Sequence, residues 1–225
     1  MRKVGSIGEV TARAVRRAAA DLIAEHGYEA MSMRQLAARV GLTSGALYNH
    51  FGSKQALLSG LLESVMTDLL AAVQRDVLCL SDPVEQLRVF IELHIGFHVS
   101  RKNDVLIATT ELRSLDATNL AKVVRLRNRY EVILSSILRR GVRLRIFSLS
   151  DVKTTTLAII PMLTGVAQWY RPGRRMTREQ LIERYIALCM AMVGATEMHA
   201  RDRSQRKPAD VNQESTQPDA VLQLE

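Results

Sequence analysis

Apolar residues recur at intervals of three and four along most of the chain, which is the spacing of amphipathic helices. No stretch alternates between apolar and polar residues for long enough to require a strand. We therefore expect an all-α protein of about nine helices without internal repeats. The predicted helices cover residues 9–27, 32–40, 44–50, 54–79, 82–99, 104–115, 118–140, 151–170 and 178–193.

The first predicted helix has an apolar stripe with arginines beside it. The stripe consists of Val10, Ala14, Ala18, Leu22 and Ile23. Arg13, Arg16 and Arg17 fall outside the stripe, so we expect them on another face of the helix. Glycine positions predict where helices end, because glycine adopts the backbone conformation of a C-terminal cap. Gly27, Gly41 and Gly141 are expected to be such ends.

Capping side chains mark several helix starts. In a capping box, a serine or threonine oxygen accepts a backbone N–H three residues on, and a glutamine there reaches back. The predicted starts are the capping boxes Ser32-Met-Arg-Gln35 and Thr177-Arg-Glu-Gln180, Ser53 before residues 54–79, Asp82 with Pro83, and Asp151 before the helix to about residue 170.

Residues 32–40 and 44–50 form a pair of short helices joined by a turn, with the spacing of a helix-turn-helix. The second helix carries small and polar residues where a core helix would carry apolar ones, while Leu47 and Phe51 are expected to anchor it inward. Such a helix suits the major groove of DNA, where side chains reach base edges and phosphates. The spacing alone leaves a generic helical hairpin open.

Net charge and cysteine content narrow the class of protein. The charge is +8 and the isoelectric point about 9.9, which favours a polyanion or an acidic membrane surface as partner, although composition alone fits any arginine-rich soluble protein equally well. Cys79 and Cys189 have no CxxC partner and are expected to be small core residues. With no signal peptide and no long apolar run, we expect a cytoplasmic protein without a membrane partner.

Residues 11–58 resemble the DNA-binding domain of the TetR family of repressors. The segment Met33-Arg-Gln-Leu-Ala-Ala-Arg-Val-Gly-Leu-Thr-Ser-Gly-Ala-Leu-Tyr-Asn-His-Phe-Gly-Ser-Lys54 carries the match, and Ser32 stands where the family more often has threonine. The resemblance implies a recognition helix near residues 44–50 and a homodimer on operator DNA. The expected DNA-binding residues are Ser32, Arg34, Thr43, Ser44, Gly45, Tyr48, Asn49, His50 and Lys54.

The resemblance also divides the chain. It implies a DNA-binding domain over residues 1–55 and a helical ligand-binding and dimerisation domain over residues 56–198. Residues 199–225 are polar, with few large apolar side chains, and are predicted to be a disordered tail. At the other end, Arg2 and Lys3 are either additional DNA contacts or part of a solvated tip.

Residues 111–115, 141–147 and 168–173 resemble a TetR subgroup associated with the breakdown of lipids, steroids or aromatic acids. Members of that subgroup often respond to coenzyme A thioesters; Arg174 departs from the subgroup, which often has a second glycine there. Candidate cations for the thioester phosphates are Arg101, Lys102, Arg113, Arg125, Arg127 and Arg129. The expected ligand-binding residues are His94, His98, Arg113 and Trp169.

His94 and His98 are four residues apart and share one helix face, which is also the spacing of a two-histidine metal site. There is no cysteine nearby, and Glu92 lies off that face. We therefore expect pocket lining or packing, with no metal and no cofactor. A regulator that responds to a metal or to another small molecule stays the alternative.

The remaining helices bear on assembly and on rival functions. Residues 159–170 and 178–193 are apolar enough to form a four-helix interface between two copies, or else to close a monomer core. The chain lacks a glycine-rich phosphate loop, a GxSxG motif and paired carboxylates with an evident role, so we expect no enzyme. A helical interaction protein is the second rival, and it predicts no salt-dependent DNA binding.

Overall fold

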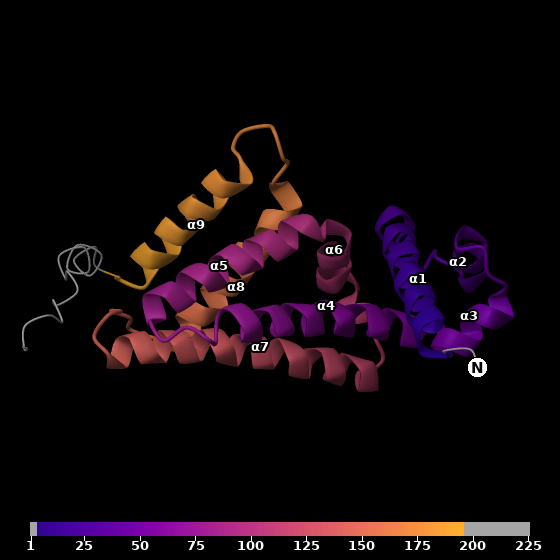
Figure 1. Cartoon of the computed structure of the whole chain (residues 1–225), viewed down its shortest axis with the longest axis horizontal. Helices are drawn as coiled ribbons and strands as arrows, with labels where there is room; N and C mark the ends of the chain where they lie inside the picture. Colours follow the sequence, from indigo (N-terminus) through magenta and orange to yellow (C-terminus); the bar gives the residue numbers. More distant parts are fainter. Residues whose placement is uncertain (1–3, 196–225) are drawn as a thin grey trace, which may run out of the picture. The chain divides into compact units, whose positions relative to one another are not determined.

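The computed structural model describes residues 4–195, which fold into helices without any strand, as expected (Figure 1). The predicted tail, residues 199–225, lies outside the described residues, and so do Arg2 and Lys3. The described part contains nine α-helices and a short 3₁₀ helix. Their bounds are α1 Val4–His26, α2 Met33–Arg39, α3 Ser44–Phe51, α4 Lys54–Asp76, α5 Pro83–Ser100, α6 Lys102–Thr110, η1 Glu111–Ser114, α7 Ala117–Arg143, α8 Val152–Trp169 and α9 Arg178–Met192.

The predicted capping side chains begin their helices. Ser32 Oγ accepts the Gln35 backbone N–H at 3.2 Å, and Gln35 Oε1 accepts the Ser32 N–H at 2.9 Å, which completes the capping box of α2. Thr177 and Gln180 form the same arrangement at the start of α9. The other predicted caps, Ser53, Asp82 and Asp151, also accept a backbone N–H from the first turn of the following helix. Local hydrogen bonding therefore sets where these helices start.

The buried face of α1 is rotated from the predicted stripe. Val15 and Ala19 are fully buried and pack with Leu22 and Ile23, whereas Ala14 is exposed. Both sets of residues have helical spacing, so the sequence pattern in this alanine-rich helix did not distinguish them. The packing of α1 against α2, α4 and α6 selects the observed face.

Gly141 does not end α7, contrary to the sequence-based expectation. The helix continues to Arg143, and Gly141 is buried within its last turns. A Cβ at this position would overlap the ring of Phe147, which folds back from the following connection. Glycine is present here because the ring occupies the space of a side chain, and the helix stops only at Leu144.

Two hydrophobic clusters meet in α4. The first half of α4, including Leu57 and Leu62, packs with α1, α2 and α3 and with residues of α6 and α7. The second half, from Met66 onward, packs with α5, α7, α8 and α9. Figure 1 shows α1, α2 and α3 gathered at the N-terminal end of α4, and α7 running alongside α4. One continuous helix therefore belongs to both clusters.

By length and composition α4 is also apolar enough to cross a bilayer, and it is the one such helix among the described residues. Its mean hydropathy reaches 1.6 over its most apolar stretch, of which 56% is buried inside the protein. The apolar side chains of α4 face other helices, as those of a core helix do.

Candidate nucleic-acid interface and ligand cavity

The helix α3 is held at both ends by its own residues. Thr43 caps its start, with Oγ1 accepting the Ala46 N–H at 3.2 Å. Leu47 is fully buried and Phe51 is half-buried, so these two side chains anchor the helix as predicted. Gly41 has a φ of +68°, and the Leu42 N–H bonds to the Ala37 carbonyl at 2.9 Å. The turn between α2 and α3 is thereby fixed.

The opposite face of α3 is exposed and polar. Thr43, Gly45, Asn49 and His50 are exposed, the Tyr48 side chain is 47% exposed, and Ser44 is half-buried. A Cβ added to Gly45 would meet no atom of the protein within 4 Å. The fold itself gives no steric reason for glycine at this position.

Ser32, the N-cap of α2, and Arg34 in the first turn of α2 are also exposed. Arg39, from the last turn of α2, donates through both terminal nitrogens to Glu25 of α1 at 3.1 Å, and this ion pair lowers the pKa of the Glu25 carboxyl. The ammonium of Lys54 donates to the Glu29 carbonyl at 3.1 Å and lies 4.3 Å from the centre of the Tyr28 ring. Lys54 is therefore already held inside this part of the fold.

A cavity of about 380 Å³ lies between α4, α5, α6, α7 and α8. Most of its wall is apolar, and a smaller group of polar side chains reaches into it. The apolar residues include Val65, Met66, Leu69, Val105 and Ile160, and the polar ones are His94, His98, Thr109, Arg127, Tyr130, Glu131, Thr164 and Gln168. An apolar wall with a few polar groups is typical of a small-molecule site.

Both predicted histidines line this cavity and form part of a buried network. His94 Nδ1 lies 2.9 Å from the Tyr130 hydroxyl, and His94 Nε2 lies 3.2 Å from Thr164 Oγ1. His98 Nδ1 donates to the backbone carbonyl of His94 at 2.7 Å. Because a carbonyl only accepts, the proton of neutral His98 is on Nδ1, and Nε2 is left as an acceptor. Nε2 has no hydrogen-bond partner among residues 11–195.

Burial sets the charge of these groups. It lowers the pKa of His94 well below its usual value, with help from nearby His98, and it lowers the pKa of His98 to about 4. Burial also raises the pKa of the Tyr130 hydroxyl well above its usual value. The imidazoles and the phenol are therefore neutral at neutral pH.

Arg127 supplies positive charge to the cavity wall. It donates from Nη2 to the Ala108 carbonyl at 2.9 Å, and burial lowers its pKa while nearby Glu131 opposes that change. No carboxylate of the described residues lies within ion-pair distance of Arg127. A half-buried guanidinium with one backbone contact retains donors for an anionic or carbonyl group.

The other two predicted ligand-binding residues lie elsewhere. Arg113 is exposed on η1 and Trp169 is 50% exposed at the end of α8, and neither lines this cavity. Sequence reasoning had not singled out Tyr130, Thr164 or Gln168, and it had given Arg127 only as one of six candidate cations. Choosing among those cations requires the rotation of α7 against its neighbours, which periodicity does not fix.

The two histidines do not form a metal-binding arrangement with other ligands. Within residues 11–195, no cluster of three or more histidine, cysteine, aspartate or glutamate side chains is placed to hold an ion. The two ring nitrogens of His94 already have hydrogen-bond partners, and the rings of His94 and His98 stack. Coordination by His94 would require breaking one of these bonds.

Two family models match the chain over most of its described length. Residues 15–61 match the model for bacterial regulatory proteins of the tetR family, and residues 80–193 match the tetracyclin repressor-like C-terminal domain. The HTH-type transcriptional repressor KstR2 of Mycobacterium tuberculosis is 27% identical over 175 residues, covering 76% of this chain and 87% of that protein.

Two solved structures illustrate proteins with the same fold. PfmR of Thermus thermophilus, described as a TetR family transcriptional regulator, has a TM-score of 0.73 and 34% identity, covering 79% of this chain and 97% of that one. AibR, solved in complex with isovaleryl coenzyme A and operator DNA, has a TM-score of 0.75 and 24% identity, covering 83% of this chain and 100% of that one.

Proposed function

Because the chain belongs to the tetR family of bacterial regulatory proteins, we propose that it is a ligand-controlled repressor. It binds a palindromic operator in the cytoplasm as a homodimer, and a small effector that enters the α4–α8 cavity releases it. The effector is an amphipathic anion, with acyl-CoA thioesters as its chemical class. The observation that carries the proposal is the pairing of an exposed polar face on α3 with a cavity whose wall includes the second half of α4.

The surface of α3 supports DNA binding. Thr43, Tyr48 and Asn49 are exposed on one short helix that Leu47 anchors from behind. Asparagine pairs with adenine and threonine contacts the thymine methyl in the major groove. Exposed Ser32 and Arg34 at the start of α2, together with His50, are placed for backbone phosphates, which fix the register of the protein on the duplex. Lys54 adds no support here, because its ammonium already bonds to the Glu29 carbonyl.

The exposed apolar side chains of α8 and α9 support a homodimer. Leu157 and Trp169 on α8 are 47% and 50% exposed, and Leu188 and Met192 on α9 are 52% and 40% exposed. Large apolar side chains at this exposure on two neighbouring helices are typical of an interface between subunits. A dimer places two recognition helices on half-sites about 34 Å apart, one turn of DNA.

The α4–α8 cavity supports an acyl-CoA or a related effector. Its volume of about 380 Å³ suits the acyl and thioester portion of such a molecule. Arg127 can donate to the thioester carbonyl or to an anionic group, and His98 Nε2 can accept a hydrogen bond. AibR shares this fold and is described in complex with isovaleryl coenzyme A, and a fatty acid metabolism regulator of Bacillus subtilis is 25% identical over 126 residues.

Release requires that the effector binds the DNA-free arrangement more tightly than the DNA-bound one, since a ligand of equal affinity shifts nothing. Met66 and Leu69 of α4 line the cavity, while Leu57 and Leu62 of the same helix pack with the DNA-binding helices. A shift of α4 on ligand entry therefore changes how the two recognition helices of a dimer are spaced.

The DNA-binding part of the proposal is tested by selecting bound sequences from a pool of random duplexes. We expect a palindromic consensus and a binding constant that falls steeply with salt. The matched variants are Asn49→Ala on α3 and Gln74→Ala on the exposed face of α4. Loss of affinity in Asn49→Ala alone supports the proposal, whereas the absence of any enriched sequence contradicts it.

A further inference from the structure

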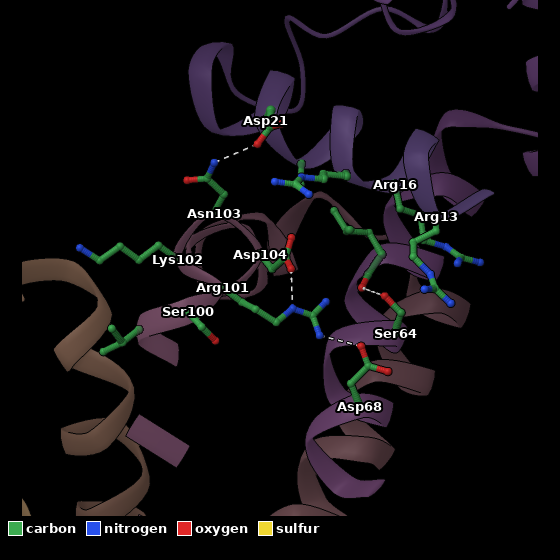
Figure 2. A pocket seen from close by; sticks show the side chains of 14 residues that line it. Arg13, Arg16, Asp21, Ser64, Asp68, Ser100, Arg101, Lys102, Asn103 and Asp104 are labelled. Carbon is green, nitrogen blue, oxygen red and sulfur yellow. Dashed lines mark hydrogen bonds and ion pairs between the residues drawn. The ribbon is translucent and has the colours of Figure 1, made fainter. Parts of the chain in front are cut away.

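A second cavity, of about 860 Å³, lies between α1, α4 and the start of α6 (Figure 2). It shares no lining residue with the cavity between α4 and α8. Five basic side chains line it, namely Arg13, Arg16, Arg17, Arg101 and Lys102, together with the carboxylates of Asp21, Asp68 and Asp104. Its chemistry is therefore charged, in contrast to the mostly apolar wall of the other cavity.

The three carboxylates of this cavity already have partners outside the α1 arginines. Arg101 Nη1 lies 2.6 Å from Asp68, and Arg101 Nε lies 2.7 Å from Asp104. Asn103 donates to Asp21 at 3.1 Å. Figure 2 shows Arg101 reaching across to Asp68 on α4, and Asn103 reaching up to Asp21 on α1. The three carboxylates are thus paired or hydrogen-bonded with Arg101 and Asn103.

The three α1 arginines carry the remaining positive charge. Arg13, Arg16 and Arg17 form no ion pair with any carboxylate of residues 11–195. Arg16 Nε is buried without a hydrogen-bond partner, and it is the one such side-chain nitrogen or oxygen in residues 11–195. Buried donors are nearly always paired in folded proteins, so this one points to an acceptor from outside the chain.

An anion from solution fits this cavity better than DNA does. No residue of α2 or α3 lines the cavity, and its other walls come from α4, α5 and α6. Figure 2 places Arg13 and Arg16 next to one another, on the side where Ser64 of α4 lies. Guanidinium groups bind phosphate oxygens in pairs, and a volume of this size suits a metabolite.

We propose that the cavity between α1, α4 and α6 binds a small phosphorylated anion with at least two phosphate groups, held by Arg13, Arg16 and Arg17. This site is separate from the effector cavity and goes beyond the proposed function. A ligand here contacts α1 of the DNA-binding helices and also α4, the end of α5 and the start of α6, so it bridges α1 and the helices that follow the DNA-binding helices. It therefore stabilises the protein and changes its affinity for DNA without entering the α4–α8 cavity.

Calorimetric titration and thermal unfolding of the full chain with inorganic pyrophosphate and with ADP test this site. Sodium sulfate at matched ionic strength is the control for general salt effects. The variants are Arg13→Gln and Arg17→Gln, whose side chains are exposed and whose loss should not unfold the protein, and Arg16→Gln. Arg139→Gln on the exposed face of α7 is the matched control for removal of one positive charge.

We expect saturable binding of pyrophosphate or ADP, with a rise in Tm that sulfate does not reproduce. Each α1 variant should bind at least about tenfold more weakly, and Arg139→Gln should match the wild type. Equal binding by all variants, or no saturable binding by the wild type, would overturn the proposal. It would also be overturned if Arg13→Gln and Arg17→Gln only weakened DNA binding, because the arginines would then serve DNA phosphates instead.

Discussion

The imidazole rings of His94 and His98 stack face to face, with centroids 3.8 Å apart and planes inclined by 5°. Two protonated rings at this separation would repel, and both are buried, so the stack depends on neutral histidines. The hydrogen bonds to Tyr130 and Thr164 hold the pair in the wall of the α4–α8 cavity. Protonation of these histidines at low pH should therefore disturb this part of the cavity wall.

Stability should fall as the pH drops below about 6.5. The pKa of His98 is lowered from 6.5 to about 4 in the folded state, so between these values the unfolded chain binds more protons than the folded one. His98 thus contributes stability that is present above pH 6.5 and is lost as pH falls toward 4, roughly 3 kcal/mol in total. Urea unfolding across this range measures the loss.

Two variants separate the contribution of His98 from general acid effects. His98→Asn keeps a donor near the position of Nδ1 but does not titrate, so its stability should vary less with pH over the same range. His26→Asn replaces an exposed histidine and should behave like the wild type. If His98→Asn loses as much stability on acidification as the wild type, burial of His98 is not the cause.

Replacing two glycines in long helices by alanine should change the free energy of unfolding in opposite directions. Gly141→Ala places a methyl group against the buried Phe147 ring and should destabilise the protein by about 1–3 kcal/mol. Gly60→Ala in α4 meets no atom within 4 Å and should stabilise by about 0.5–1 kcal/mol, as alanine does in a helix. Chemical denaturation measures the free energy of unfolding of both variants. If Gly141→Ala leaves this free energy unchanged, the Phe147 ring is free to move aside.

Gly45→Ala should separate folding from DNA binding. The added methyl group meets no protein atom within 4 Å, so the free energy of unfolding should stay the same or rise slightly. The close approach of α3 to the major groove would be lost, and affinity for the selected operator should drop about tenfold or more. Fluorescence anisotropy and urea unfolding of the same preparation measure the two effects. Unchanged affinity would mean that Gly45 does not face DNA.

Leu188→Glu should convert the proposed dimer into a monomer. The Leu188 side chain is 52% exposed on α9, and a carboxylate at the centre of an apolar interface would be buried without a partner. Val132→Glu on α7, at 59% exposure, is the matched control and should leave the dimer intact. Sedimentation velocity distinguishes the two states. A wild-type monomer, or a dimer that tolerates Leu188→Glu, would place the interface elsewhere.

Local signals allowed most of the helix starts to be predicted from the sequence. Ser32, Ser53, Asp82 and Thr177 each bond to a backbone N–H within their own first turn, so the information lies within four residues. Leu47 was identified as the anchor of α3 because the surrounding residues are polar. The helix-turn-helix spacing depends on these same short-range features.

Features that depend on packing between helices could not be read from the sequence. Gly141 has the residue type of a helix end, but the ring of Phe147 explains it instead. Of the basic residues on α7, Arg127 alone lines the α4–α8 cavity, because the rotation of α7 is set by its contacts with α4, α5 and α8. Trp169 was expected to contact the ligand, but it does not line this cavity. Its position likewise depends on how its helix packs against the neighbouring helices.

The proposed function depends on one step, in which an effector in the α4–α8 cavity releases the protein from DNA. Its most direct test is fluorescence anisotropy on the selected operator during titration with acyl-CoA thioesters, isovaleryl coenzyme A included, and with free coenzyme A as the control. One thioester class should release the wild type and Arg125→Gln, whose side chain is exposed on α7, whereas Arg127→Gln should need at least about tenfold more. No release by any thioester, or equal release of the two variants, would contradict this step.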